Sequence, residues 1–153
     1  MNKIEELIQE LCPEGLEYKN IGSICNIKTG KGITKKDSSV NGLYPIISGG
    51  KEPMGFYNEY NRLGKTVTIS RVGANAGYVK FINSKFYLND KCFSIIPKDK
   101  FKDDINTKYL YYKLKNIESE INELQSEGGV PTINTNKVSS LNIPIPSLPI
   151  QQE

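Results

Sequence analysis

Short apolar runs separated by turn residues fill the middle of the chain. Four runs rich in Val, Ile, Tyr, Phe and Thr are predicted to be β-strands, at residues 43–48, 65–71, 77–82 and 92–97. A fifth, more loosely alternating strand is predicted over residues 16–27. Glycine and asparagine separate these runs, so the middle of the chain is predicted to be β-rich with long polar loops.

Apolar side chains at helical spacing predict a helix on each side of this β-rich part. Residues 2–11 have apolar residues at steps of three and four, which predicts a short amphipathic helix that ends at Cys12 and Pro13. A longer helix is predicted from the N-cap candidates Asn106 and Thr107 up to Gly128. Its apolar positions are Leu110, Leu114, Ile117, Ile121 and Leu124. This spacing favours packing onto the β-rich unit, and a coiled-coil face stays an alternative.

Three prolines, Pro144, Pro146 and Pro149, exclude a helix from residues 143–150 and favour an extended strap. The fold class predicted is therefore α+β. It consists of a mixed, β-rich twisted sheet with long polar loops, a short N-terminal helix, one longer helix packed on the sheet and the proline strap. Residues 1–142 are predicted to form a single domain, and residues 143–153 the strap.

The charge of the chain is concentrated in its middle. The net charge is only +3 over 153 residues, but residues 19–91 carry twelve basic against four acidic side chains, a net charge of +8. Residues 1–18 carry −4 and residues 92–153 carry −1. A basic middle suits a face that binds a polyanion, although a merely solvated lysine surface remains an alternative. The sequence has no apolar run long enough to cross a bilayer and no signal sequence, so a cytoplasmic location is expected, without membrane contact.

Several kinds of chemistry lack their usual residues. The chain has no histidine, which removes the commonest zinc ligand and the usual general base at neutral pH. The three cysteines have no C-x-x-C spacing, so reduced thiols are expected. Gly64-Lys65-Thr66 resembles the end of a phosphate-binding loop, but Glu59 stands where that loop needs a glycine. No catalytic residue, metal site or small-molecule substrate is therefore predicted.

Several motifs, read in order, give a more specific indication. They are Tyr44-Pro-Ile-Ile-Ser-Gly-Gly50, Gly55-Phe-Tyr57, Thr68-Ile-Ser-Arg-Val-Gly73 and Gly77-Tyr-Val79. Together they resemble the target recognition domain of a type I restriction-modification specificity subunit. Residues 4–15 and 141–152 resemble the usual opening and closing segments of that domain, so the resemblance covers nearly the whole chain.

This resemblance implies that the chain reads one half of a split site in double-stranded DNA and performs no catalysis itself. Its implied partners are methyltransferase (modification) subunits and restriction motor-nuclease subunits, and S-adenosylmethionine and ATP are expected only on those partners. Residues 143–153 would lead into a spacer helix that this sequence does not contain. Two alternatives remain: a truncated specificity protein that binds methyltransferase subunits without reading DNA, and, least favoured, a small enzyme with an unrecognised site.

Candidate DNA-binding residues lie in or beside the polar loops. The candidates for neutralising phosphates are Lys28, Lys31, Lys35, Lys36 and Lys51. The candidates for reading bases are Ser48, Tyr57, Asn58, Arg71, Asn75, Thr132 and Asn134. An arginine can donate two hydrogen bonds to guanine, and an asparagine can pair with adenine.

Each base-reading candidate also has a structural alternative. Arg71 could pair with an acid, Asn75 could adopt a positive φ, and Tyr57 could cover the β core. Residues 128–136 could be a helix C-cap followed by a turn.

Overall fold

The structure is a computed structural model that describes residues 18–39, 41–125, 132–146 and 151–152. The helix predicted over residues 2–11 lies outside the described residues. Residues 147–150 of the predicted strap lie outside them as well.

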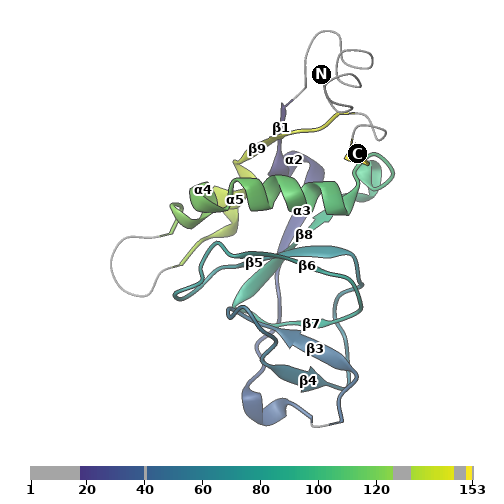
Figure 1. The fold of residues 1–153 in the computed structure, drawn as a ribbon, viewed down its shortest axis with the longest axis vertical. Helices are drawn as coiled ribbons and strands as arrows, with labels where there is room; N and C mark the ends of the chain where they lie inside the picture. The colour runs from purple at the N-terminus through teal and green to yellow at the C-terminus, as the bar shows by residue number, and fades with distance from the viewer. Residues whose placement is uncertain (1–17, 40, 126–131, 147–150, 153) are drawn as a thin grey trace.

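A four-stranded antiparallel sheet forms the centre of the molecule (Figure 1). Its strands, in spatial order, are β2 (Cys25–Thr29), β8 (Cys92–Pro97), β5 (Thr66–Ser70) and β6 (Val79–Ile82). Successive side chains of a strand point to opposite faces, so Val67 and Ile69 point to one face, where they join the main hydrophobic core. All five residues of β5 are buried, so both faces of this strand are covered.

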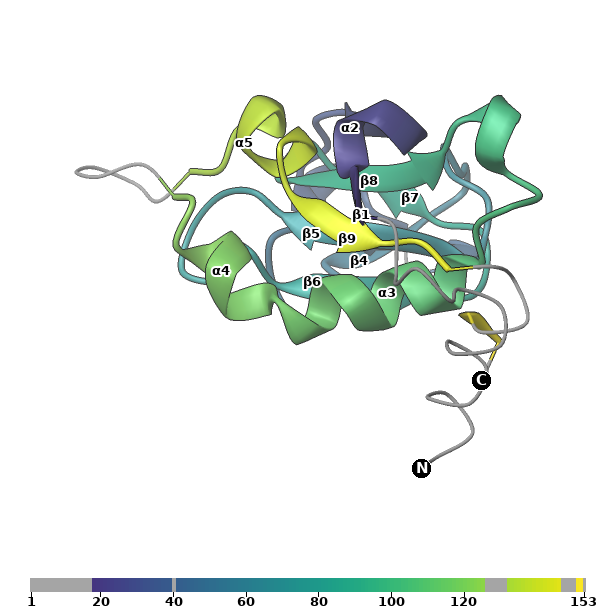
Figure 2. The same ribbon diagram turned by 90° about the horizontal axis from the view of Figure 1, so that it is seen from above.

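The longest of the described helices, α3 (Thr107–Asn116), lies across β5 and β6 (Figure 2). Asn106 caps it, because the Asn106 side chain accepts a hydrogen bond from the Tyr109 N–H at 2.9 Å. Leu110 and Leu114 are fully buried in the main core. The predicted start of this helix and its packing onto the β-rich unit are therefore confirmed. A 3₁₀ turn, η2 (Asp99–Phe101), lies between β8 and α3.

The helix predicted to continue to Gly128 ends instead at Ile117, where φ is −108° and ψ is 22°. A second helix, α4 (Glu118–Asn122), follows. The side chain of its first residue accepts a hydrogen bond from the N–H of Val79, the first residue of β6, at 2.9 Å, and that of its last residue donates to the Ala76 carbonyl oxygen in the β5–β6 connection at 2.7 Å. The prediction of one continuous helix is wrong because these bonds to the sheet connection hold α4 as a separate element.

Residues 16–27 do not form one strand. Among the described residues of this range, β1 (Tyr18–Asn20) is followed by one helical turn, α2 (Ile21–Ile24), and only then by β2. The Asn20 side chain starts the turn by accepting the Gly22 N–H at 3.1 Å. Both isoleucines of the turn are buried on one face. The single-strand prediction is wrong because the apolar spacing of these residues also fits a capped helical turn.

The last part of the chain returns to its beginning. Strand β9 (Asn142–Pro144) pairs antiparallel with β1, and α5 (Thr135–Ser139) packs beside α2. The extended conformation predicted for the strap is confirmed for residues 143 and 144. The predicted domain division between residues 142 and 143 falls inside β9, and the division itself remains a prediction.

A buried glutamine fixes the described end of the chain to the start of α3. The Gln151 side chain is 5% exposed. It accepts a hydrogen bond from the Asn106 N–H at 2.7 Å and donates to the carbonyl oxygens of Asp104 (2.8 Å) and Pro146 (2.7 Å). These three bonds satisfy backbone groups that would otherwise be buried without partners.

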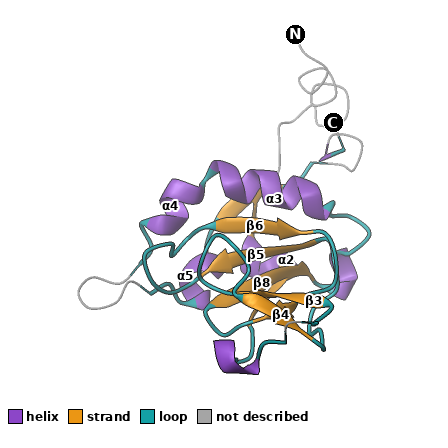
Figure 3. Cartoon of the chain, turned by 60° about the horizontal axis from the view of Figure 1, so that its bottom comes forward, coloured by secondary structure: helices purple, strands orange, loops and turns teal. Residues whose placement is uncertain are grey.

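A second, three-stranded sheet lies at the lower end of Figure 1 and in front in Figure 3. Its order is β4 (Gly55–Tyr57), β3 (Tyr44–Ile47) and β7 (Tyr87–Leu88), with β3 antiparallel to β4 and parallel to β7. A small core of Ile47, Phe86, Leu88 and Cys92 joins this sheet to the central one.

The α+β fold class and four of the five predicted strands are confirmed. Residues 92–97 were predicted with the bounds that β8 has, and the predictions at 43–48, 65–71 and 77–82 extend only one or two residues beyond β3, β5 and β6. Strands β4 and β7 were not predicted, because two or three residues are too few to show an alternating pattern.

Candidate nucleic-acid interface

The connection between β5 and β6, residues 71–77, is a tight turn held by two glycines. Gly73 and Gly77 have φ values of 90° and 96°, which favour glycine. The Gly77 N–H bonds the Ser70 carbonyl oxygen at 2.7 Å, and the Ala76 N–H bonds that of Gly73 at 3.1 Å. Two glycines with positive φ therefore close the connection between β5 and β6. Asn75 does not have a positive φ, because Lys65 is the only non-glycine residue of the described chain that does.

Two segments that are distant in sequence lie against this 71–77 turn. The loop that begins at Ser48 is held by the Ser70 hydroxyl, which donates to the Gly49 carbonyl oxygen at 3.2 Å. On the other side, the Ile133 N–H bonds the Arg71 carbonyl oxygen at 2.7 Å, and Thr132 pairs with Val72 in an isolated β-bridge. The fold therefore brings together three of the segments that were predicted to read bases.

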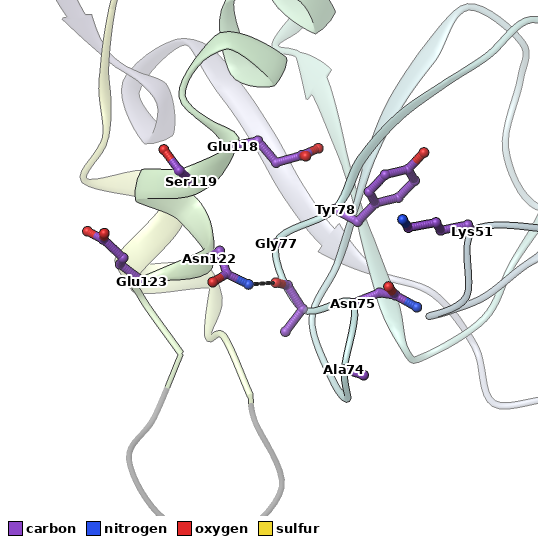
Figure 4. Close-up of a pocket in the computed structure, with 10 residues that line it drawn as sticks. Lys51, Ala74, Asn75, Gly77, Tyr78, Glu118, Ser119, Asn122 and Glu123 are labelled. Carbon is purple, nitrogen blue, oxygen red and sulfur yellow. Dashed lines mark hydrogen bonds between the residues drawn. The ribbon is translucent and has the colours of Figure 1, made fainter.

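A cavity of about 400 Å³ opens between the 71–77 turn and helix α4 (Figure 4). Asn75 and Lys51 line one side of it, and Glu118 and Glu123 line the α4 side. Its lining is therefore polar and carries both signs of charge. Gly77 brings the turn close to α4, since a Cβ at this position would lie 2.8 Å from the Asn122 backbone.

Arg71 and Asn75 keep polar groups available beside the cavity. The Arg71 guanidinium is partly buried and donates one hydrogen bond, from Nη1 to the Asp90 carbonyl oxygen at 2.8 Å. This contact is with backbone and not with an acid, so most of the five N–H groups of Arg71 have no partner among the described residues. The Asn75 side chain lines the cavity and is partly exposed.

The other base-reading candidates have structural contacts. Asn134 caps α5 by accepting the Lys137 N–H at 2.9 Å. The Ser48 hydroxyl accepts a hydrogen bond from Asn89 at 3.1 Å. Tyr57 packs edge-on against Tyr87, with ring centroids 5.1 Å apart, in the three-stranded sheet. Thr132 belongs to the β-bridge already described. Asn58 is exposed just after β4.

The five phosphate candidates divide between two places. Lys51 is exposed at the edge of the cavity. Lys35 and Lys36 are exposed on a 3₁₀ turn, η1 (Lys35–Asp37), and the Ser39 N–H just after it bonds the Phe56 carbonyl oxygen of β4 at 2.7 Å. Lys31 is exposed in the loop before η1, and Lys28 is exposed near the end of β2. Of the five, the structure brings only Lys51 directly beside the 71–77 turn.

The η1 turn is fixed by one carboxylate. Asp37 accepts hydrogen bonds from both the backbone N–H and the hydroxyl of Thr34, each at 2.9 Å. These bonds, the backbone one first, hold the pKa of Asp37 below its usual value. The turn therefore presents Lys35 and Lys36 from a fixed backbone.

Sequence reasoning missed several residues around the cavity. Tyr78 follows the turn directly, and Lys80, Lys115 and Glu118 lie close to it. Burial lowers the pKa of Lys80 below its usual value. The one local signal was the position of Tyr78 next to Gly77, since Lys115 and Glu118 reach this place only through the packing of α3 and α4.

Neither a metal cluster nor a membrane-spanning helix is present in the described part of the chain. In residues 18–39, 41–125, 132–146 and 151–152, no cluster of three or more Asp, Glu or Cys side chains is arranged to hold a metal ion. Within the same ranges, no helix has the length and apolar character needed to span a membrane.

Comparison with known proteins identifies the fold. Two putative type I specificity subunits of Mycoplasma pneumoniae are 28% and 31% identical to this chain, over 83% and 89% of its length. The chain spans about a third of their length, 33% and 37%. The crystal structure of a type I restriction-modification S subunit from M. genitalium superimposes with a TM-score of 0.76 at 22% identity, over 87% of this chain and 35% of that one.

The match to a protein family extends over most of the chain. The model of the family described as type I restriction modification DNA specificity domain matches residues 13–153. These residues include the 71–77 turn, the segments packed against it and the surrounding cavity. The chain therefore belongs to the family of type I restriction-modification DNA specificity domains.

Proposed function

We propose that this domain binds double-stranded DNA and reads the base pairs of one half of a split target site. The observation that carries the proposal is the convergence on the 71–77 turn of the loop from Ser48 and the segment from Thr132. These segments come from three separate parts of the sequence, and they form one polar surface with glycines where a close approach to a groove is needed.

Within this surface, Arg71 and Asn75 are the proposed base readers. Arg71 has N–H groups to spare after its bond to the Asp90 carbonyl oxygen, and a guanidinium can donate two parallel bonds to guanine. Asn75 at the turn offers the donor and acceptor pair that matches adenine. Asn134 is a weaker candidate, because its side-chain oxygen is already occupied by the cap of α5.

The proposed phosphate contacts come from the lysines of two neighbouring regions. Lys51 would hold the backbone beside the 71–77 turn, and Lys31, Lys35 and Lys36 would hold it further along the three-stranded sheet. Such contacts contribute affinity and salt dependence but carry no sequence information.

The chemistry that follows recognition is proposed to belong to other chains. Methyltransferase subunits would use S-adenosylmethionine, and restriction motor-nuclease subunits would use ATP. This domain would then be a recognition part without catalysis. The match to specificity subunits, about a third of whose length this chain spans, supports this division of roles.

Affinity measurements on matched and mismatched duplexes test the reading role. A duplex selected by this chain from a randomised library at low salt serves as the matched site, and single base-pair changes give the mismatches. We expect Arg71→Ala to cost about 1–3 kcal/mol on the matched duplex and to relax discrimination at one position. Lys36→Ala should weaken binding to all duplexes alike.

Two results would contradict the proposal. Equal losses for Arg71→Ala on every duplex would remove its reading role. No DNA binding at low salt, together with capture of methyltransferase subunits, would instead favour a protein-interaction module that does not read DNA.

A further inference from the structure

The aromatic ring of Tyr78 collects three lysine side chains beside the 71–77 turn. The ammonium nitrogens of Lys115, Lys51 and Lys80 lie 4.0, 5.3 and 5.9 Å from the ring centroid. All three distances are within the range of cation–π attraction, which is about 6 Å. The lysines come from three different elements: helix α3, the loop after Ser48 and strand β6. We call these four residues the Tyr78 cluster.

The cluster has more positive than negative charge. Among the described residues, its one ion pair joins Lys115 to Glu118, with Nζ and Oε2 2.7 Å apart. Lys51 and Lys80 have no ion pair among the described residues, although Glu52 acts on Lys80 from a greater distance and Glu123 lines the α4 side of the cavity. Cation–π attraction to the ring favours this arrangement, and mutual repulsion of the three cations opposes it. An anion bound at this place would relieve that repulsion.

Two of the lysines are fixed and partly used. Lys80 Nζ donates to the Gly50 carbonyl oxygen, and Lys115 Nζ donates to the Val79 carbonyl oxygen at 3.2 Å. Burial lowers the pKa of Lys80, because its charged form is incompletely solvated, while Glu52 acts in the opposite direction. These two lysines therefore have few donors left for a ligand, and the charge of Lys115 is balanced by Glu118.

The other two members of the cluster keep free donors. Lys51 is exposed, and its ammonium group has no hydrogen-bond or ion-pair partner among the described residues. The Tyr78 hydroxyl likewise has no partner within the described part of the chain. Both residues line the cavity, and Figure 4 shows the Tyr78 ring between the Glu118 carboxylate and Lys51. An incoming anion is therefore directed to the Lys51 side, away from Glu118.

We propose that Lys51 and Tyr78, supported by Lys80 and Lys115, form a clamp for one backbone phosphate of the bound DNA. The inference rests on the proposed function, and to Lys51, a candidate from the sequence, it adds Tyr78, Lys80 and Lys115, which the sequence did not indicate. A phosphodiester carries one negative charge and accepts hydrogen bonds from an ammonium group and a phenolic hydroxyl together. Held here, the phosphate fixes the DNA strand next to Arg71 and Asn75, so that the clamp sets the register of reading.

Three substitutions separate the parts of the clamp. Lys51→Ala should reduce the slope of log K against log salt by about 0.9, the value for one phosphate contact, and should weaken matched and mismatched duplexes alike. Tyr78→Phe keeps the ring but removes the hydroxyl, so binding should weaken several-fold with the slope unchanged. Tyr78→Leu removes the ring as well and should lower both affinity and slope.

Lys85→Ala is the matched control. Lys85 also lies over a tyrosine ring, with Nζ 4.6 Å from the Tyr60 centroid, but it follows the opposite end of β6 from the 71–77 turn. Lys85→Ala therefore removes the same charge as Lys51→Ala, and the same kind of contact with a tyrosine ring, at a place away from the clamp. We expect its slope to match that of the unchanged chain. Thermal unfolding of each variant verifies that the domain is folded in the binding assay.

The outcomes separate the clamp from the proposed function. If the unchanged chain does not bind DNA in a salt-dependent way, the proposed function fails. If it does, and Lys51→Ala behaves like Lys85→Ala, the clamp is wrong while the function stands. A loss for Lys51→Ala on the matched duplex alone would also overturn the clamp, because it would make Lys51 a base reader. Inorganic phosphate at constant ionic strength should not displace DNA, and displacement abolished by Lys51→Ala would make this a site for free phosphate.

Discussion

Gly77 and Gly73 offer a comparison that tests whether the 71–77 turn is held against helix α4. Both have a positive φ, 96° and 90°, so alanine at either position is strained. They differ in surroundings. A Cβ at Gly73 meets no atom within 4 Å, whereas a Cβ at Gly77 lies 2.8 Å from both the N and the Cα of Asn122. Real Cβ atoms do not approach backbone so closely, so the turn and α4 must separate.

The expected loss of stability follows from the backbone strain at each glycine and from the crowding at Gly77. Backbone strain alone costs roughly 1–2 kcal/mol for a left-handed alanine, and Gly73→Ala should lose about this much. Gly77→Ala has in addition an overpacking cost of about 1–3 kcal/mol, so its total loss should be about 2–5 kcal/mol. The clash also threatens the hydrogen bond of 2.7 Å from the Asn122 side chain to the Ala76 carbonyl oxygen.

Urea unfolding followed by circular dichroism measures both losses on the same scale. For a domain of this size, each kcal/mol corresponds to about 2–4 °C in the midpoint of thermal unfolding. Asn122→Ala is a useful third variant, because it removes the side-chain bond but leaves the backbone in place. Equal losses for Gly73→Ala and Gly77→Ala would refute the reasoning, since the contact with α4 would then contribute nothing.

Two further predictions concern buried polar groups. Gln151→Leu should lower the free energy of unfolding in urea by about 2–4 kcal/mol, because three backbone groups lose their partner; the exposed neighbour Gln152→Leu is the control, and equal effects would contradict the tether. Burial raises the pKa of Cys25 to about 12 and that of Cys92 to about 11. The stability that the protonated thiols contribute is complete below pH 9, their ordinary pKa, and is lost as the pH rises through 11 and 12. Between pH 8 and pH 11, the free energy of unfolding should therefore fall more steeply with pH for the unchanged chain than for Cys92→Ala. Equal slopes for the two proteins would contradict this.

Local pattern was sufficient where an element is a continuous strand between clear boundaries. Strand β8 was predicted with its bounds because an apolar run lies between Lys91 and the residues after Pro97. Prediction from local pattern failed where two patterns overlap. The turn α2 has two isoleucines at a spacing of three, which also fits loose alternation, and the cap by Asn20 decides between them. The break at Ile117 is likewise set by contacts of α4 with the sheet and not by any residue that ends helices.

The candidate site was predictable only in part, for the same reason. The 71–77 turn could be predicted because Gly73 and Gly77 are close in sequence and require a special backbone. The pairing of residues 132 and 133 with it could not, because such a contact joins segments some sixty residues apart through a single bridge. The alternative that Asn75 adopts a positive φ is wrong. The helix C-cap suggested for residues 128–136 begins outside the described residues, and within them Asn134 caps the start of α5 instead.

The positive charge of residues 19–91 also changes its meaning once the fold is known. Arg62 is half-buried and donates to the Ser94 hydroxyl at 2.9 Å and to carbonyl oxygens of β2 and its own loop. Burial lowers its pKa from the usual value, and it holds the central sheet together, so it is not available to a phosphate. Lys80 is likewise committed to the Gly50 carbonyl oxygen. Counting basic residues therefore overstates the number of phosphate contacts. We therefore expect phosphate contacts from exposed ammonium groups that have no hydrogen-bond or ion-pair partner among the described residues and lie beside the 71–77 turn, as Lys51 does.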